Sequence, residues 1–143
     1  MIVLLSFQTP GMTQKETADT SFFGVGASIE EISSGVYKVI SAGEKAAEGF
    51  VHTPDISMIN KKWKYQIDLK GEGKVYWKIE ETNARGRFMK EQKSKPILLT
   101  GEWKTYDIDI ELDTESSQID VFVLTSSDRQ TKFYFRNSHV IER

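Results

Sequence analysis

Regular alternation of large apolar and polar residues between positions 63 and 80 constrains the fold of this chain more than any other feature. The two halves of the segment read Trp63-Lys64-Tyr65-Gln66-Ile67-Asp68-Leu69-Lys70 and Lys74-Val75-Tyr76-Trp77-Lys78-Ile79-Glu80. Side chains of a β-strand point alternately to opposite faces, so this pattern predicts two half-buried strands. The glycine-containing turn at 71–73 predicts that they pair as an antiparallel hairpin, with Trp63, Tyr65 and Trp77 facing the core.

Strand-like segments separated by turn residues continue to the end of the chain. Besides an extended opening segment at 21–32, the expected strands are 36–40, 49–53, 56–58, 85–91, 96–100, 103–112, 119–124 and a closing strand from 133 towards 141. The segment 119–124 is apolar on both faces, which predicts a central strand buried on both sides. At most one helical turn is expected, within 41–48. Short strands at regular spacing are typical of an all-β sandwich or barrel.

The length of 143 residues predicts one domain, placed at 21–143, preceded by an N-terminal tail or linker at 1–20. The apolar run at 2–5 is far shorter than the roughly 20 residues of a membrane span and lacks the basic leader of a signal peptide. Two interpretations stay open for this run. It is either a short strand or tail, or the remnant of an export or membrane segment.

Composition excludes several classes of function. The chain has no cysteine, which removes disulfides, thiol catalysis and thiolate metal sites. The formal net charge of −2 gives no general attraction to nucleic acid, so no nucleic-acid partner is expected, and no membrane insertion by this domain either. The two histidines, His52 and His139, lack the spacing of a metal site. No cofactor and no metal ligand set is therefore predicted.

Three segments carry a resemblance to a known family: the Lys-Lys-Trp-Lys-Tyr strand from 61, the Gly-Glu-Trp-Lys-Thr-Tyr motif at 101–106, and the aromatic closing strand at 131–141. From residue 22 to residue 143 the chain resembles the jelly-roll carbohydrate-binding modules of the galactose-binding-domain-like class. The resemblance implies an all-β jelly-roll β-sandwich of two antiparallel sheets. It also implies non-catalytic recognition of a glycan or polysaccharide, in an extracellular or cell-surface protein.

One departure from this family concerns calcium. The closing strand of such modules usually carries an aspartate that helps to hold a structural calcium ion. The corresponding stretch here contains Arg136 and Asn137 instead, which argues against an orthodox calcium site.

Candidate ligand-binding residues follow from the outward faces of the expected strands, because part of that surface would be the concave face on which jelly-roll modules hold sugar chains. Exposed rings suit the apolar faces of sugars, and neighbouring charged groups suit their hydroxyls. The candidates are Tyr76, Lys78, Glu80, Phe88, Trp103, Tyr134 and Arg136. Each candidate also has a structural interpretation. Trp103 is then a plug at the edge of the core, Phe88 and Tyr134 are packing partners across strands, and Lys78 with Glu80 is an ordinary solvated ion pair.

Two other classes of function are alternatives to glycan binding. The domain is alternatively a structural or protein-interaction sandwich, an accessory domain docking on neighbouring domains of a larger chain. A glycosidase needs two carboxylates at a set separation, and Asp107, Asp109 and Glu111 lie on one face of their strand. Alternating acids are common on solvent-exposed strands, so the sequence predicts no enzyme.

Overall fold

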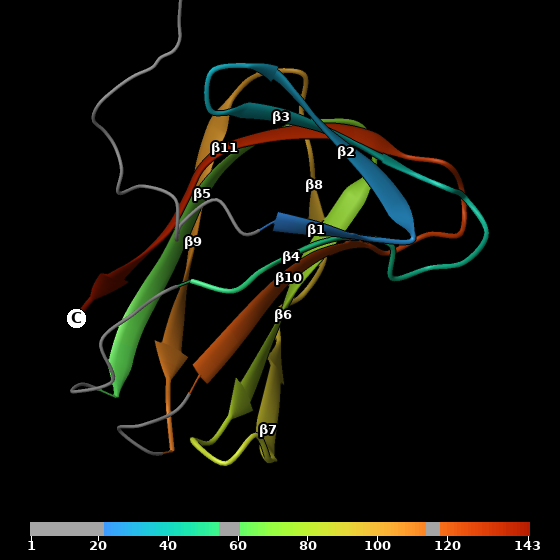
Figure 1. Ribbon diagram of the computed structural model, residues 1–143. Helices are drawn as coiled ribbons and strands as arrows, with labels where there is room; N and C mark the ends of the chain where they lie inside the picture. Colours follow the sequence, from blue (N-terminus) through green and yellow to red (C-terminus); the bar gives the residue numbers. More distant parts are fainter. Residues whose placement is uncertain (1–21, 55–60, 114–117) are drawn as a thin grey trace, which may run out of the picture.

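The computed structural model describes residues 22–54, 61–113 and 118–143, and the regular elements in these ranges are all β-strands (Figure 1). In chain order they are β1 (Phe22–Val25), β2 (Ala27–Ser33), β3 (Val36–Ser41), β4 (Gly49–His52), β5 (Lys62–Gly71), β6 (Lys74–Thr82), β7 (Phe88–Lys93), β8 (Ile97–Leu98), β9 (Lys104–Glu111), β10 (Gln118–Thr125) and β11 (Lys132–Glu142). The expected helical turn within 41–48 is wrong, because this segment forms bends.

The strands form two antiparallel sheets stacked as a sandwich (Figure 1). One sheet has the order β1-β4-β10-β6-β7, with the short β8 also paired to β6. The other has the order β2-β3-β11-β5-β9. The prediction of an all-β sandwich of two antiparallel sheets is confirmed.

The core between the sheets is built from the inward residues of nearly every strand. Trp63, Tyr65 and Trp77 are 7%, 0% and 4% exposed, so the inward assignment that the alternation predicts is confirmed for all three. Near β1, a stack of rings joins the layers: Phe50 of β4 lies 4.0 Å from Phe135 of β11, centroid to centroid and almost parallel. Burial of such large rings is the main stabilising term of a sandwich of this size.

The segment predicted as a central strand lies where expected. Strand β10 is paired on both sides, by β4 and by β6. Its inward residues Ile119, Val121 and Val123 are fully buried, whereas Phe122 on the outward side is only half-buried.

The predicted hairpin is wrong. Strand β5 pairs with β11 and β9 in one sheet, whereas β6 pairs with β10, β7 and β8 in the other. The glycine-rich turn carries the chain from one layer to the other. Leu69 and Val75 therefore enter the same core from opposite sheets, and the outward faces of β5 and β6 lie on opposite sides of the molecule.

The turn is held by contacts that no hairpin would make. Gly71 N–H donates to the carbonyl of Thr100, and Glu72 N–H donates to the carbonyl of Lys132. Gly71 has φ 152°, and a Cβ there would lie 2.6 Å from that of Phe133. Only glycine lets the chain pass so close to β11.

Several expected boundaries are also corrected. The opening segment 21–32 is divided into β1 and β2 at Gly26, which has φ 61°. The expected strand 85–91 begins at Phe88, and 96–100 shortens to the two residues of β8. Trp103 precedes β9 instead of lying within it. The expected tail at 1–20 and the expected strand at 56–58 lie outside the described residues.

Candidate functional site

The seven candidate residues do not form one site, because the two sheets divide them. Tyr76, Lys78 and Glu80 point outward from β6, and Phe88 starts the neighbouring strand β7. The other three lie on the opposite sheet, at or beside β9 and on β11: Trp103, Tyr134 and Arg136. We call the outward surface of β1-β4-β10-β6-β7 the β6 face and that of β2-β3-β11-β5-β9 the β11 face.

A continuous row of side chains crosses the β6 face. Strand register aligns the outward residues Phe23, Val51, Phe122, Lys78 and Lys93, one from each of β1, β4, β10, β6 and β7. A neighbouring row aligns Asp120, Glu80 and Glu91. Paired residues on adjacent strands lie about 5 Å apart, so the first row crosses all five strands and the second crosses β10, β6 and β7.

Lys78 is the most constrained side chain of this face. Its Nζ lies 4.4 Å from the centroid of the Phe122 ring and 3.2 Å from Oε2 of Glu80. The side chains of Lys78 and Glu80 are only 22% and 28% exposed. A lysine held by both a ring and a carboxylate loses little further side-chain entropy when a ligand binds, which favours recognition.

Two more acidic residues of the β6 face have partners. Lys93 Nζ lies 3.4 Å from Oε2 of Glu91, and Thr53 donates a hydrogen bond to Asp120. The face therefore combines donors and acceptors without a strong net charge.

Three rings of the β6 face remain open. Phe23 and Phe88 are 63% and 57% exposed, and Tyr76 is half-buried. Within the described part of the chain, no other ring and no cation stacks on these three. Their apolar surfaces are free to contact a ligand.

The aromatic residues of the β11 face are covered by the protein's own cations. The guanidinium carbon of Arg136 lies 4.2 Å from the centroid of the Trp103 ring. Lys70 Nζ lies 5.1 Å from the centroid of the same ring and 5.5 Å from that of Tyr134. Trp103 and Tyr134 are both half-buried beneath these charges.

Asp68 fixes this arrangement. Its carboxylate accepts hydrogen bonds from Thr105 Oγ1 at 2.7 Å, from Arg136 Nε at 3.1 Å and from Asn137 Nδ2 at 2.9 Å. Burial alone would raise the pKa of Asp68, but these hydrogen bonds and the charge of Arg136 outweigh it and hold the pKa below its usual range. Arg136 is thereby oriented over Trp103.

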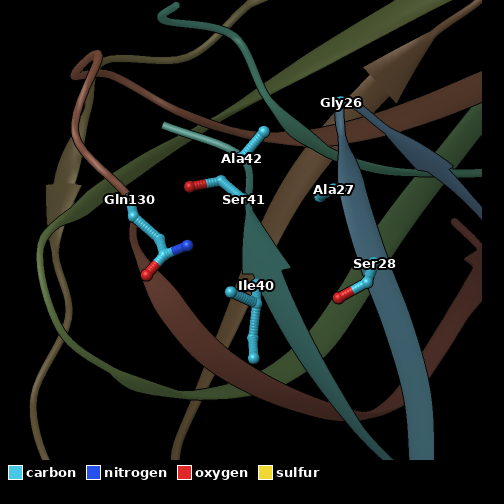
Figure 2. A pocket seen from close by; sticks show the side chains of 7 residues that line it. All are labelled: Gly26, Ala27, Ser28, Ile40, Ser41, Ala42 and Gln130. Carbon is cyan, nitrogen blue, oxygen red and sulfur yellow. The ribbon is translucent and has the colours of Figure 1, made fainter. Parts of the chain in front are cut away.

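Three hollows lie around the start of β11. The one shown in Figure 2 has a volume of about 400 Å³ and is lined by Gly26, Ala27, Ser28, Ile40, Ser41, Ala42 and Gln130. It contains no ring and no charged side chain. A second, of about 300 Å³, is lined by Lys70, Gly71, Glu72, Gly101, Lys132 and Tyr134. A third, of about 320 Å³, lies between the β5–β6 turn and residues 127–131.

The acids of β9 lie on the surface, and two of them take part in ion pairs. Asp109 and Glu111 are exposed and lie 3.6 Å and 3.9 Å from Arg143 and Lys62, respectively. His52 is buried in the core. Among the described residues there is no group of three histidine or acidic side chains arranged for a metal ion, and no helix suited to cross a membrane.

Comparison with known proteins identifies the fold. No protein-family model and no curated protein matches the sequence. Among solved structures, a variant of the carbohydrate-binding module CBM29-2 complexed with cellulohexaose has a TM-score of 0.62 and 14% identity, covering 87% of this chain and 80% of that chain. A CBM4 structure has a TM-score of 0.59 and 10% identity, covering 85% of this chain and 94% of that chain. The fold is that of the jelly-roll carbohydrate-binding modules.

A third similar structure has a different role. The enzymatically active domain of tailspike protein 4 from bacteriophage CBA120 has a TM-score of 0.65 and 11% identity. The match covers 89% of this chain but only 20% of that chain. At these identities the comparisons establish the fold alone, and the chemistry of this chain rests on its own side chains.

Sequence reasoning missed part of the β6 face. Phe122 and Asp120 were not candidates, because 119–124 was interpreted as buried on both faces. Phe23 lies in a segment whose outward side the alternation did not define. Phe122 lies opposite Lys78 across the β10–β6 pair. This contact could be inferred only if the pairing of β10 with β6 were already known.

Proposed function

We propose that this domain is a non-catalytic carbohydrate-binding module that holds a neutral glycan chain on its β6 face. The observation that carries the proposal is the half-buried Lys78, held between the Phe122 ring and Glu80, with Tyr76 two positions along the same strand. The polar groups are preorganised to bind sugar hydroxyls, and the ring of Tyr76 offers an apolar surface.

The balanced charges of the β6 face support a neutral ligand. Lys78, Lys93, Glu80 and Glu91 form two ion pairs that provide both donors and acceptors. A polysaccharide without charged groups satisfies both kinds of partner and need not break either pair. The solved complex of a similar module with cellulohexaose supports a chain of glucose units as the first ligand to test.

The role expected for such a domain is to bring a larger extracellular or cell-surface protein to its glycan. It has no catalytic function in this proposal. This is consistent with the exposed, ion-paired acids of β9 and with the similarity to carbohydrate-binding modules.

The test is affinity electrophoresis of the purified domain in gels containing neutral polysaccharides, followed by calorimetry with cellohexaose. Tyr76→Ala and Lys78→Met should each weaken binding by about tenfold, because each removes a contact of at least 1 kcal/mol. Tyr134→Ala, which removes a ring from the opposite face, is the matched control and should leave neutral binding unchanged. Folding is verified by circular dichroism.

Absence of retardation by every neutral polysaccharide, with the fold intact, would contradict the proposal. Equal losses in the Tyr76 and Tyr134 variants would contradict the assignment to the β6 face.

A protein-interaction role is the second candidate. Leu98 of β8 is 65% exposed and Phe88 of β7 is 57% exposed, and both strands pair with β6 near the edge of its sheet. Exposed apolar residues at a sheet edge favour association with another chain. Light scattering would show a dimer that Leu98→Asp dissociates if this candidate holds, and a monomer if it does not.

A further inference from the structure

The β11 face carries an unpaired positive charge beside a hollow. Lys70 is half-buried between Trp103 and Tyr134, and no carboxylate of the described residues lies within 4 Å of its Nζ. By contrast, Lys38 in the same cross-strand row is paired with Glu30 at 3.4 Å. Rings alone compensate only part of the cost of partly desolvating an ammonium group, so Lys70 has capacity for an anionic partner.

A second cation lines the same hollow. Lys132 lies two positions before Tyr134 on β11, and Tyr134 is the cross-strand partner of Lys70. This makes Lys70 and Lys132 diagonal neighbours on one face, with Cα atoms roughly 7–8 Å apart. Lys132 is exposed and has no ion pair within the described ranges. The two ammonium groups repel each other, and an anion between them would remove that repulsion.

The only acidic residue in the lining of this hollow is Glu72. It also lines the third hollow, where Arg129 lies, so its charge is shared between two cationic environments. Two lysines and one glutamate give the lining of this hollow a positive charge balance, although the whole chain has a net charge of −2. This contrasts with the paired charges of the β6 face.

We infer that the hollow of about 300 Å³ beside Lys70 and Lys132 is a second glycan site, which takes the anionic group of an acidic polysaccharide. The two lysines bind the carboxylate or sulfate, and Tyr134 forms the wall against which the sugar ring lies. That the ligand is a glycan rests on the proposed function. The residues of this second site, however, lie on the sheet opposite the β6 face. The similarity of the fold to carbohydrate-binding modules favours an acidic polysaccharide over an oligonucleotide, whose binding is a separate outcome of the test.

Affinity electrophoresis tests this inference with four probes: polygalacturonate for a carboxylate, dextran sulfate for a sulfate, unsubstituted dextran, and oligothymidylate. The double variant Lys70→Gln/Lys132→Gln should lower the affinity for an acidic polysaccharide by about tenfold, since charge-assisted contacts of this kind are lost. Glu72→Gln should raise that affinity, because it removes the one repulsive group.

Lys61→Gln is the matched control. It removes one positive charge beside the same strand β5, but nine positions from Lys70, or roughly 30 Å along an extended strand. It should leave acidic binding within twofold of the original chain. Higher salt should weaken binding of the original chain and have little effect on the double variant.

The inference is overturned if neither acidic polysaccharide retards the protein, if Lys61→Gln costs as much as the double variant, or if oligothymidylate binds as tightly with the same residue dependence. Loss of neutral binding in Tyr76→Ala tests the β6 face separately. Each site can therefore fail without the other.

Discussion

His52 shows how a single polar side chain is accommodated in this core. Its Nδ1 is hydrogen-bonded to Ser138 Oγ at 2.8 Å, and the hydroxyl of Tyr65 is bonded to the same oxygen at 2.6 Å. Burial, with a smaller contribution from the charge of His139, lowers the pKa of His52 to about 4. Burial also raises the pKa of Tyr65, so both groups are neutral at physiological pH.

The stability of the domain should therefore depend on His52 between pH 6.5 and pH 4. The unfolded chain binds a proton below about pH 6.5, whereas the folded protein takes it up only near pH 4. The stabilisation by neutral His52 is fully present above pH 6.5 and is lost as the pH falls through this range, with roughly 2 kcal/mol lost by pH 5. Urea unfolding of the original chain and of His52→Gln at pH 7.5 and pH 5 measures this difference.

His52→Gln cannot bind the proton, so its free energy of unfolding should fall less between the two pH values. Parallel pH profiles for the two proteins would contradict the prediction. The other titrating groups are the same in the original chain and in His52→Gln, so their contributions to the pH dependence of stability cancel.

At the scale of single residues, the sequence predicts which way a side chain points but not which side chains it contacts. The period-two pattern correctly placed Tyr76, Lys78 and Glu80 outside the core. It did not show that Ser138 turns inward. That depends on a bulge in β11, where the register shifts between Arg136 and His139 and Asn137 has φ 56°.

Among the elements, the β5–β6 turn has the largest consequence, because it transfers the chain between sheets. The turn needs Gly71, whose missing side chain leaves room for Phe133. It is also tied to residues distant in sequence, since Leu99 N–H donates to the carbonyl of Gly73.

Gly71→Ala should destabilise the domain by about 2–3 kcal/mol. The added Cβ would overlap Phe133, and φ 152° is unfavourable for alanine. The matched control is Gly86→Ala, at φ 80° with no atom within 4 Å of the added Cβ, which should cost only about 1 kcal/mol. Thermal or urea unfolding gives both values.

Equal costs for the two glycine variants would show that backbone conformation alone matters at Gly71. A larger cost at Gly71 would show that the close approach of the turn to β11, its neighbour in the same sheet, itself contributes to stability.

Most elements could be predicted from the sequence because strand alternation is a local property. The partners of those strands could not. A glycine turn between two alternating strands fits a hairpin within one sheet and a crossing between two sheets equally well. The strand pairings and the hydrogen bonds from the turn to Thr100 and Lys132 distinguish the two cases.

The whole molecule presents two outward faces of different charge character. The β6 face has ion-paired charges and open rings, whereas the β11 face has covered rings and unpaired lysines beside a hollow. The fold matches that of carbohydrate-binding modules, but a shared fold does not determine which face binds.

The two faces should bind their ligands independently. They lie on opposite sheets, separated by a core whose inward residues are almost entirely buried. Calorimetry with an oligogalacturonate should give the same Kd, within twofold, in the absence and in the presence of saturating cellohexaose. A large change in Kd would mean that both ligands use one surface, or that binding on one sheet alters the other.

The sequence by itself determined most of the strands, the inward and outward sides of β5 and β6, and the class of fold. Alternation indicates whether a side chain faces water or the interior, because successive residues of a strand point to opposite faces. This is a local property of the chain. The tertiary structure alone decided that the seven candidate residues divide between two surfaces and that Phe122 joins Lys78. The physical reason is that both sheets bury their inward side chains in the same core. A strand has the same alternating pattern in either sheet, so the pattern does not indicate which sheet the strand joins.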